Sequence, residues 1–173
     1  MTEHESIANA SAAARNTGDE GDSRQYLSFF LGGQEYATDI LRVQEIKGWD
    51  TVTRVPYSPS YILGVINLRG AIVPVVDLRV RFALESAPFD CATVVIVVRV
   101  AGVRGERIVG LVVDAVSDVY SFSAANIQPP PEAVGSIDHM FVLGLAKHED
   151  KLVIILDIER LVISSVLGDT KAA

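Results

Sequence analysis

The chain has 173 residues, of which 49% are hydrophobic and 21% are charged, and its formal net charge is −7. This composition indicates a globular protein of one ordinary domain or two very small ones, because disordered chains hold fewer apolar residues and more charge. The excess of acidic residues disfavours binding to nucleic acids and to anionic membrane surfaces.

Residues 1–24 are predicted to form a disordered tail. Ile7 is its one large aliphatic residue, among Ala, Ser, Asn, Gly and acidic residues, so little surface can be buried to offset chain entropy. The tail lacks the basic stretch and apolar run of a signal peptide, and no apolar run approaches the roughly 20 residues of a membrane span. Cys91 is the single cysteine, which suits a reducing compartment. We therefore expect a soluble, cytoplasmic protein.

From Gln25 onward the sequence predicts many short β-strands. The signals are apolar or β-branched runs bounded by Gly, Pro or Asn. The expected strands are residues 26–31, 35–41, 43–46, 51–55, 61–67, 71–76, 93–100, 107–113, 116–122, 141–146 and 152–156. Short strands separated by frequent turns are typical of small barrels or a sandwich.

Two elements near the middle and the end of the chain carry more specific signals. Residues 93–100 are almost continuously apolar, which predicts a strand buried on both faces, and Cys91 before it is expected to be a small core residue. At the C-terminus Asp157 can cap a helix whose apolar stripe is Ile158, Leu161, Val162 and Val166. We place this helix at residues 157–168, with a flexible end at 169–173.

An internal repeat organises the strands. Residues 61–82 align without a gap to residues 141–162, at an offset of 80, and the segments 43–46 and 53–56 align to 116–119 and 128–131. The identities in the longer alignment are Leu63/Leu143, Gly64/Gly144, Val73/Val153 and Asp77/Asp157. Each half, about 25–90 and about 91–162, supplies about five strands, which suits a small barrel, and we expect the two barrel subdomains to be interleaved. The fold class expected is therefore mostly β, with two pseudo-equivalent barrels sharing one hydrophobic seam.

The repeat separates positions required by the fold from candidates for function. Gly64 and Asp77 recur in both halves, so we expect Gly64 to allow a close backbone approach and Asp77 to cap a turn. The hairpin tips differ, because Arg69 in the first half corresponds to Glu149 in the second. Arg69 is either a fork for a carboxylate or a merely solubilising residue. Glu45 could pair with Arg69 or with a partner, and we predict a Glu45–Arg69 ion pair within about 4 Å.

Motifs for catalysis are missing from the sequence. The three histidines, His4, His139 and His148, lack the spacing of a metal site, and there is no phosphate-binding loop or nucleophile elbow. Asp114 and Asp118 are expected to be exposed residues at a strand edge. We therefore expect a protein that is not an enzyme and needs no cofactor. The alternative is a small-ligand-binding β-barrel protein, or an enzyme with an unrecognised site.

Three blocks of sequence, VQEI, GVINLRG and PVVDLR, occur in an order and spacing that are highly specific. On these blocks, residues 25–162 resemble the CheW-like coupling domain of bacterial chemotaxis nearly end to end. The resemblance implies two SH3-like five-stranded barrels around a hydrophobic seam. It also implies an adaptor without catalytic activity, because 173 residues leave no room for an added kinase or receiver domain.

The resemblance further implies two partners and a set of contact residues. The partners are the regulatory domain of a CheA-type histidine kinase and the cytoplasmic hairpin tip of chemoreceptors, and binding to the receptors would recruit the protein to membrane arrays. The positions that match the family's contact motifs are Val43, Glu45, Ile46, Gly64, Arg69 and Val119. The N-terminal tail lies outside the resemblance.

Overall fold

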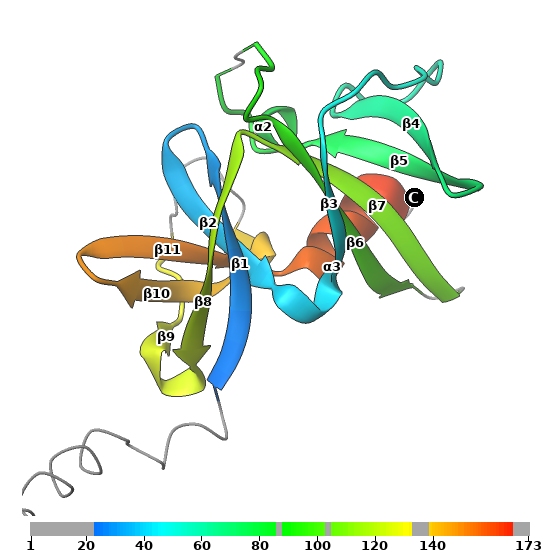
Figure 1. The fold of residues 1–173 in the computed structure, drawn as a ribbon. Coiled ribbons are helices and arrows are strands. Elements are labelled where there is room, and N and C mark those ends of the chain that lie inside the picture. The colour runs from blue at the N-terminus through cyan, green and yellow to red at the C-terminus, as the bar shows by residue number, and fades with distance from the viewer. Residues whose placement is uncertain (1–22, 86–87, 103–104, 133–138, 168–173) are drawn as a thin grey trace, which may run out of the picture.

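The computed structural model describes residues 23–85, 88–102, 105–132 and 139–167. In this part of the chain two β-sheets lie side by side, accompanied by short helices and helical turns (Figure 1). Residues 1–22 of the predicted tail and the predicted flexible end, 169–173, lie outside the described residues. Within the described ranges, no helix is long and apolar enough to cross a membrane.

The first sheet, which we call barrel 1, has five strands in the order β3-β6-β7-β5-β4. They are β3 (Val43–Gly48), β4 (Ile62–Leu68), β5 (Ala71–Asp77), β6 (Val94–Gly102) and β7 (Gly105–Val113). Neighbouring strands are antiparallel except β5 and β7, which pair in parallel. As the sequence predicted, β6 carries four successive buried residues, 95–98, because both of its faces are covered.

The second sheet, which we call barrel 2, has the strand order β8-β1-β2-β11-β10-β9. Its strands are β1 (Ser23–Leu31), β2 (Gln34–Asp39), β8 (Ala115–Ser123), β9 (Ile127–Gln128), β10 (Val142–His148) and β11 (Lys151–Leu156). Here β2 and β11 form the parallel pair. β1 begins two residues before Gln25, where the sequence predicted order to begin.

The two barrels have the same internal order. The strands β3, β6, β7, β5 and β4 of barrel 1 correspond to β8, β1, β2, β11 and β10 of barrel 2, and the parallel pair occupies the same place in each. The short β9 corresponds to an isolated bridge between Thr53 and Val65 beside β4. The predicted fold class, two pseudo-equivalent SH3-like barrels, is confirmed.

The halves of the sequence repeat, however, do not coincide with the barrels. The hairpin β1–β2 comes from the first half but pairs within barrel 2, and β6–β7 comes from the second half but pairs within barrel 1. A boundary near residue 90 therefore divides the repeat but not the two sheets. Each half lends its first hairpin to the other barrel, so the connections β2–β3 and β7–β8 both cross the seam.

The seam between the barrels is the largest apolar core of the molecule. Its buried side chains come from β1, β2, β10 and β11 on one side and from β5, β6 and β7 on the other. The largest of those that are almost fully enclosed are Phe29, Phe82, Leu31, Leu78, Ile96, Leu111, Leu156 and Leu161. Burying a side chain of this size contributes about 1.5–3 kcal/mol. The seam therefore holds the two barrels together as one body.

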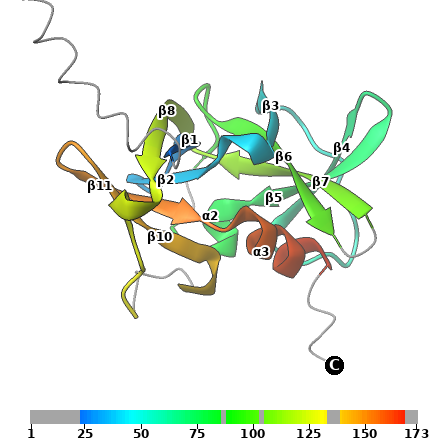
Figure 2. The same ribbon diagram turned by 90° about the horizontal axis from the view of Figure 1, so that it is seen from below.

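Two short helices line this seam, and each begins at an aspartate of the repeat (Figure 2). Helix α2 (Leu78–Arg81) is capped by Asp77, whose Oδ1 accepts from the Arg79 N–H at 2.9 Å. Helix α3 (Ile158–Val162) is capped by Asp157, whose Oδ1 accepts from the Arg160 N–H at 3.1 Å. Both predicted caps are confirmed. The helix expected at 157–168 starts as predicted, but from Ile163 to Leu167 it continues as a π-helical turn, η4.

Gly64 and Gly144 both sit at a bulge where the register of their hairpin shifts. A Cβ atom on Gly64 would lie 2.2 Å from the carbonyl oxygen of Thr53, and one on Gly144 would lie 2.6 Å from that of Gln128. Contacts this short do not occur between real atoms, so only glycine fits. Since Thr53 and Gln128 are aligned in the repeat, both barrels pass a neighbouring backbone over the same glycine, as predicted for Gly64.

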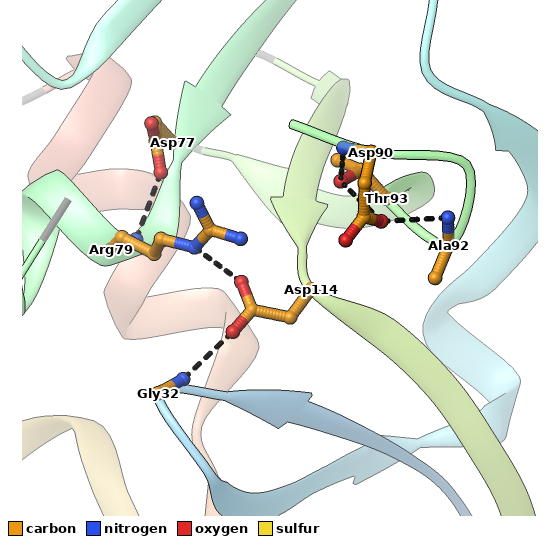
Figure 3. Close-up of polar contacts among 7 residues, drawn as sticks. All are labelled: Gly32, Asp77, Arg79, Asp90, Ala92, Thr93 and Asp114. Atoms are coloured by element: carbon orange, nitrogen blue, oxygen red, sulfur yellow. Dashed lines mark hydrogen bonds and ion pairs between the residues drawn. The ribbon is translucent and has the colours of Figure 1, made fainter. Parts of the chain in front are cut away.

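Two local expectations are wrong. Residues 51–55 do not form a strand and make a single bridge at Thr53, because this mostly exposed segment, which ends at Pro56, follows β4 only briefly. Cys91 is exposed rather than buried in the core. It lies in a turn in which Asp90 Oδ1 accepts from the Ala92 N–H at 2.8 Å, ahead of the start of β6 (Figure 3).

Candidate functional site

The turn between β4 and β5 presents Arg69 at the tip of a two-residue hairpin loop. Leu68 pairs with Ala71 across the turn, and Arg69 and Gly70 both have positive φ, 53° and 90°. Asn67 Oδ1 accepts from the Gly70 N–H at 2.8 Å and closes the loop. Positive φ strains a residue with a side chain, so these contacts hold Arg69 in a conformation that it would rarely adopt alone.

Glu45 on β3 faces this tip. Its Oε2 lies 3.0 Å from Nη2 of Arg69, and the two side chains are 22% and 77% exposed. The predicted ion pair is therefore confirmed. The two atoms are at ion-pair distance, and Glu45 Oε2 is buried and makes no hydrogen bond. The half-covered carboxylate gives Arg69 a fixed counter-charge, and the exposed guanidinium keeps N–H groups that can reach a second acceptor.

A bulge in β3 decides which neighbours of Glu45 face solvent. The register with β6 shifts between Val43 and Glu45. Glu45 pairs with Val97 on one face of β3, whereas Val43 and Ile46 pair with Val98 and Ile96 on the other face. On that other face Val43 is half-buried against the seam and Ile46 is 43% exposed. Glu45 therefore meets Arg69 on one face of this edge strand, and Ile46 is exposed on the opposite face. We call the strand edge formed by Glu45, Ile46 and Arg69 the Arg69 surface.

Gly64 is buried and is not part of this surface. It lies in β4, below the carbonyl of Thr53, and fixes how the 51–60 segment passes over the barrel. Its contribution to any binding would therefore be indirect, through the placement of that segment.

Val119 lies on β8 of barrel 2, in a different sheet from the Arg69 surface. It is the repeat counterpart of Ile46, and both side chains are 43% exposed. The six predicted site residues therefore divide into the Arg69 surface, two supporting residues in barrel 1, and one exposed residue at the equivalent place of barrel 2.

Sequence reasoning missed three strongly exposed apolar residues. Ile72 is 65% exposed on β5, Leu41 is 85% exposed in the turn η1 (Ile40–Arg42), and Tyr57 is fully exposed with a positive φ of 60°. Ile72 could have been found, because Val73 and Val75 define the inward face of its strand and alternation turns Ile72 outward. Leu41 was expected inside a strand, and nothing in the sequence signalled the fully exposed position of Tyr57.

These features match the chemistry of surfaces that bind other macromolecules. An exposed guanidinium with a fixed counter-charge recognises carboxylates well, and exposed aliphatic side chains beside it add apolar contact. In the described part of the chain, His, Cys, Asp and Glu side chains form no group of three that could hold a metal ion.

Comparison with known proteins points to one family. The CheW-like domain family matches residues 25–165. The chemotaxis protein CheW of Klebsiella aerogenes is 46% identical over 145 residues, which are 84% of this chain and 85% of that protein. A probable chemotaxis protein CheW of Rhizobium etli is 38% identical over 82% of this chain and 88% of its own length. The crystal structure of the scaffolding protein TtCheW from Thermoanaerobacter tengcongensis superposes with a TM-score of 0.72, at 37% identity, over 80% of this chain and 86% of that one.

Proposed function

The chain belongs to the CheW-like domain family, and we propose that it is a non-enzymatic scaffold that couples a CheA-type histidine kinase to chemoreceptors. The observation that carries this proposal is the Arg69 surface, where an exposed Arg69 is held 3.0 Å from the half-covered Glu45. The names of its relatives support a role in chemotaxis, and the name of the solved relative supports a scaffolding role.

The Arg69 surface would act by presenting a fixed cation beside an apolar residue. An exposed ion pair adds little to folding, about 0–1 kcal/mol, so stability is a weak reason for holding Arg69 at a strained turn. A fixed guanidinium loses less entropy when it binds a partner's carboxylate. Ile46, on the other face of the same edge strand, would add exposed aliphatic surface to a partner that covers this edge.

The kinase and the receptor need separate places on the scaffold. Ile46 on β3 and Val119 on β8 are equivalent positions in two different sheets, and each is exposed to the same degree. This arrangement supports one apolar edge for each partner. The protein would act in the cytoplasm and reach membrane arrays through the receptors.

The test is a charge reversal at Arg69, with the repeat counterpart as control. Arg69→Glu places two acids side by side, so binding to the kinase regulatory domain or to a receptor cytoplasmic fragment should weaken by tenfold or more, about 1.4 kcal/mol. Glu149→Arg changes the equivalent tip of barrel 2 and should leave that binding unchanged. Calorimetric titration with each partner separately measures both variants.

A double variant distinguishes the loss of the internal ion pair from the loss of the contact with a partner. Glu45→Arg with Arg69→Glu restores opposite charges within the protein but presents them reversed to the partner, so binding should stay weak while the melting temperature stays near that of the parent. Wild-type affinity of Arg69→Glu for both partners would contradict the proposal.

A further inference from the structure

A largely buried ion pair connects the two barrels near the seam. Arg79 follows Asp77 in helix α2 of barrel 1, and its side chain is only 9% exposed. Its Nε contacts Oδ1 of Asp114, which lies between β7 and β8 where the chain crosses to barrel 2. Figure 3 shows the two side chains pointing toward each other. The expectation that Asp114 is an exposed edge residue is wrong, because its carboxylate is 26% exposed and turned inward to Arg79.

The same carboxylate also holds barrel 2. Asp114 Oδ2 accepts from the Gly32 N–H at 2.9 Å, in the turn between β1 and β2, and the Asp114 N–H donates to the Phe30 carbonyl at 3.0 Å (Figure 3). One residue on the crossing connection therefore touches a helix of barrel 1 and a hairpin of barrel 2. We call Arg79, Asp114 and Gly32 the Asp114 link.

A second ion pair joins the other crossing connection to the other helix, and there the helix carries the negative charge. Arg42 ends the turn η1, on the other connection between the barrels, and its Nη2 lies 2.7 Å from Oε1 of Glu159 in α3. Glu159 is the repeat counterpart of Arg79. These two side chains are 40% and 38% exposed. Each crossing connection is thus tied to a helix, but one tie is in water and the other is largely buried.

The two ion pairs, Arg79–Asp114 and Arg42–Glu159, differ in how strongly they can constrain the relative orientation of the barrels. Water screens an exposed pair and replaces it easily, whereas a buried pair left without one partner is costly. The hydrophobic seam resists separation of the barrels, but apolar attraction is non-directional and specifies their rotation weakly. A charge-assisted contact with an arginine is directional. Of the two ties, the Asp114 link is therefore the stronger constraint on the angle between the barrels.

We propose that Arg79 and Asp114 are positioning residues for coupling, which fix the orientation of barrel 2 relative to barrel 1. This inference rests on the proposed scaffold function, in which the two barrels offer separate partner surfaces. A scaffold passes a signal between two partners only if it holds a defined relation between them. Neither residue belongs to the Arg69 surface, so loss of the link changes the geometry between the partners rather than either contact.

The first measurement is the distance between the barrels. Spin labels on Arg107→Cys in β7 and Lys151→Cys in β11, in a Cys91→Ser background, report it by pulsed double electron–electron resonance. The parent should give one narrow distribution, and Arg79→Gln should give a broader or shifted one. Arg42→Gln, at the exposed counterpart, should match the parent. An unchanged distribution in Arg79→Gln would overturn the proposal.

A milder variant covers the case in which Arg79→Gln does not fold. Asp114→Asn keeps an oxygen that can accept from the Gly32 N–H but removes the charge that Arg79 faces. It should broaden the distance distribution less than Arg79→Gln does while the protein stays folded. A folded Asp114→Asn protein with the distribution of the parent would count against the link.

The second measurement separates this proposal from the proposed function. The full chain is combined with a CheA-type kinase and a chemoreceptor cytoplasmic fragment from the same genome. Asp114→Asn should leave each binary affinity unchanged and lower kinase activation in the three-component complex by about fivefold or more. Full activation with a disturbed distance would overturn the positioning role alone. If the parent chain binds neither partner, the proposed function fails as well.

Discussion

Barrel 1 and barrel 2 have the same strand order, but the turns of their equivalent hairpins, β4–β5 and β10–β11, carry different residues. Arg69 and Glu149 occupy the same strained turn position, with φ of 53° and 56°. In barrel 1 the tip faces Glu45 and solvent. In barrel 2 the neighbouring His148 stacks on Tyr120 with ring centroids 4.0 Å apart, and the Tyr120 hydroxyl donates to the buried Glu35 at 2.8 Å.

The two barrels differ in the residues that lie beside this turn. In the repeat, Lys47 and Leu68 stand where barrel 2 has Tyr120 and His148. Barrel 2 therefore uses polar side chains of its own to close this end, and burial, together with the hydrogen bond to Glu35, raises the pKa of Tyr120. In barrel 1 the counterpart of His148 is the buried Leu68, which packs in an apolar core, and Arg69 stays outside. This difference supports the proposal that the turn of barrel 1 contacts a partner.

The largest expected effect is a loss of stability when the glycine that allows the close backbone approach in each barrel is replaced. Gly64→Asp would press a Cβ against the backbone of Thr53, at 2.2 Å from its oxygen, and would bury a carboxylate. It should lower the free energy of unfolding by more than about 4 kcal/mol. Gly144→Asp should cost somewhat less, because its Cβ would lie 2.6 Å rather than 2.2 Å from the opposing carbonyl oxygen and because its φ is not positive. Urea denaturation measures both.

Gly48→Ala is the matched control for these two variants. No atom lies within 4 Å of its added Cβ, and its φ is not positive. Its stability should stay close to that of the parent. If Gly64→Asp were as stable as Gly48→Ala, the close backbone approach would not constrain the fold.

The second-largest expected effect is the difference in stability loss between removing the Arg79–Asp114 ion pair and removing the Arg42–Glu159 ion pair. Arg79→Ala leaves the partly buried Asp114 without its guanidinium and should destabilise the protein by about 3 kcal/mol. Arg42→Ala removes an exposed pair and should cost about 0–1 kcal/mol. Thermal unfolding at low and high salt distinguishes them, because only the exposed pair is strongly screened. Equal losses would show that the difference in burial has no energetic consequence.

A smaller gain in stability is expected when the turn of barrel 2 is given the arginine that barrel 1 has at position 69. Glu149→Arg places an arginine opposite Asp118, the counterpart of Glu45, and should form a new surface ion pair. The expected gain is about 0–1 kcal/mol. A double-mutant cycle with Asp118→Ala isolates the coupling between the two residues. A zero coupling energy would mean that the two tips are not equivalent in geometry.

The smallest effect is a pH dependence at the cap of α2. Burial raises the pKa of Asp77 above its ordinary 3.8, although N–H groups of Arg79 and Val80 oppose the rise. The folded state therefore holds this proton more tightly than the unfolded chain, so stability falls as pH rises from about 3.8 through the raised pKa. Asp77→Asn keeps the cap and should flatten this part of the stability curve. Denaturation at several pH values checks it, and an unchanged curve would contradict it.

The sequence predicted local structure well because local signals decide it. Alternation and apolar runs indicated ten of the strands within a few residues of their observed bounds. Repeated residues indicated the close backbone approach at Gly64 and both aspartate caps. The Glu45–Arg69 pair followed from contrasting the two halves, since opposite charges occur at these positions in one half only. Cys91 was misplaced because an apolar strand nearby does not determine where the preceding turn points.

From the sequence alone follow the two equivalent barrels, the glycine and aspartate positions that both require, and the hairpin turn at which they differ. The sequence predicted interleaved subdomains, but that the first hairpin of each half joins the other barrel is visible only in the fold. An apolar hairpin carries the same pattern whichever sheet it completes, so periodicity cannot choose its partner. The Asp114 link was hidden for the same reason. Arg79, Asp114 and Gly32 are far apart in the chain, and the exchange of hairpins across the seam brings them together.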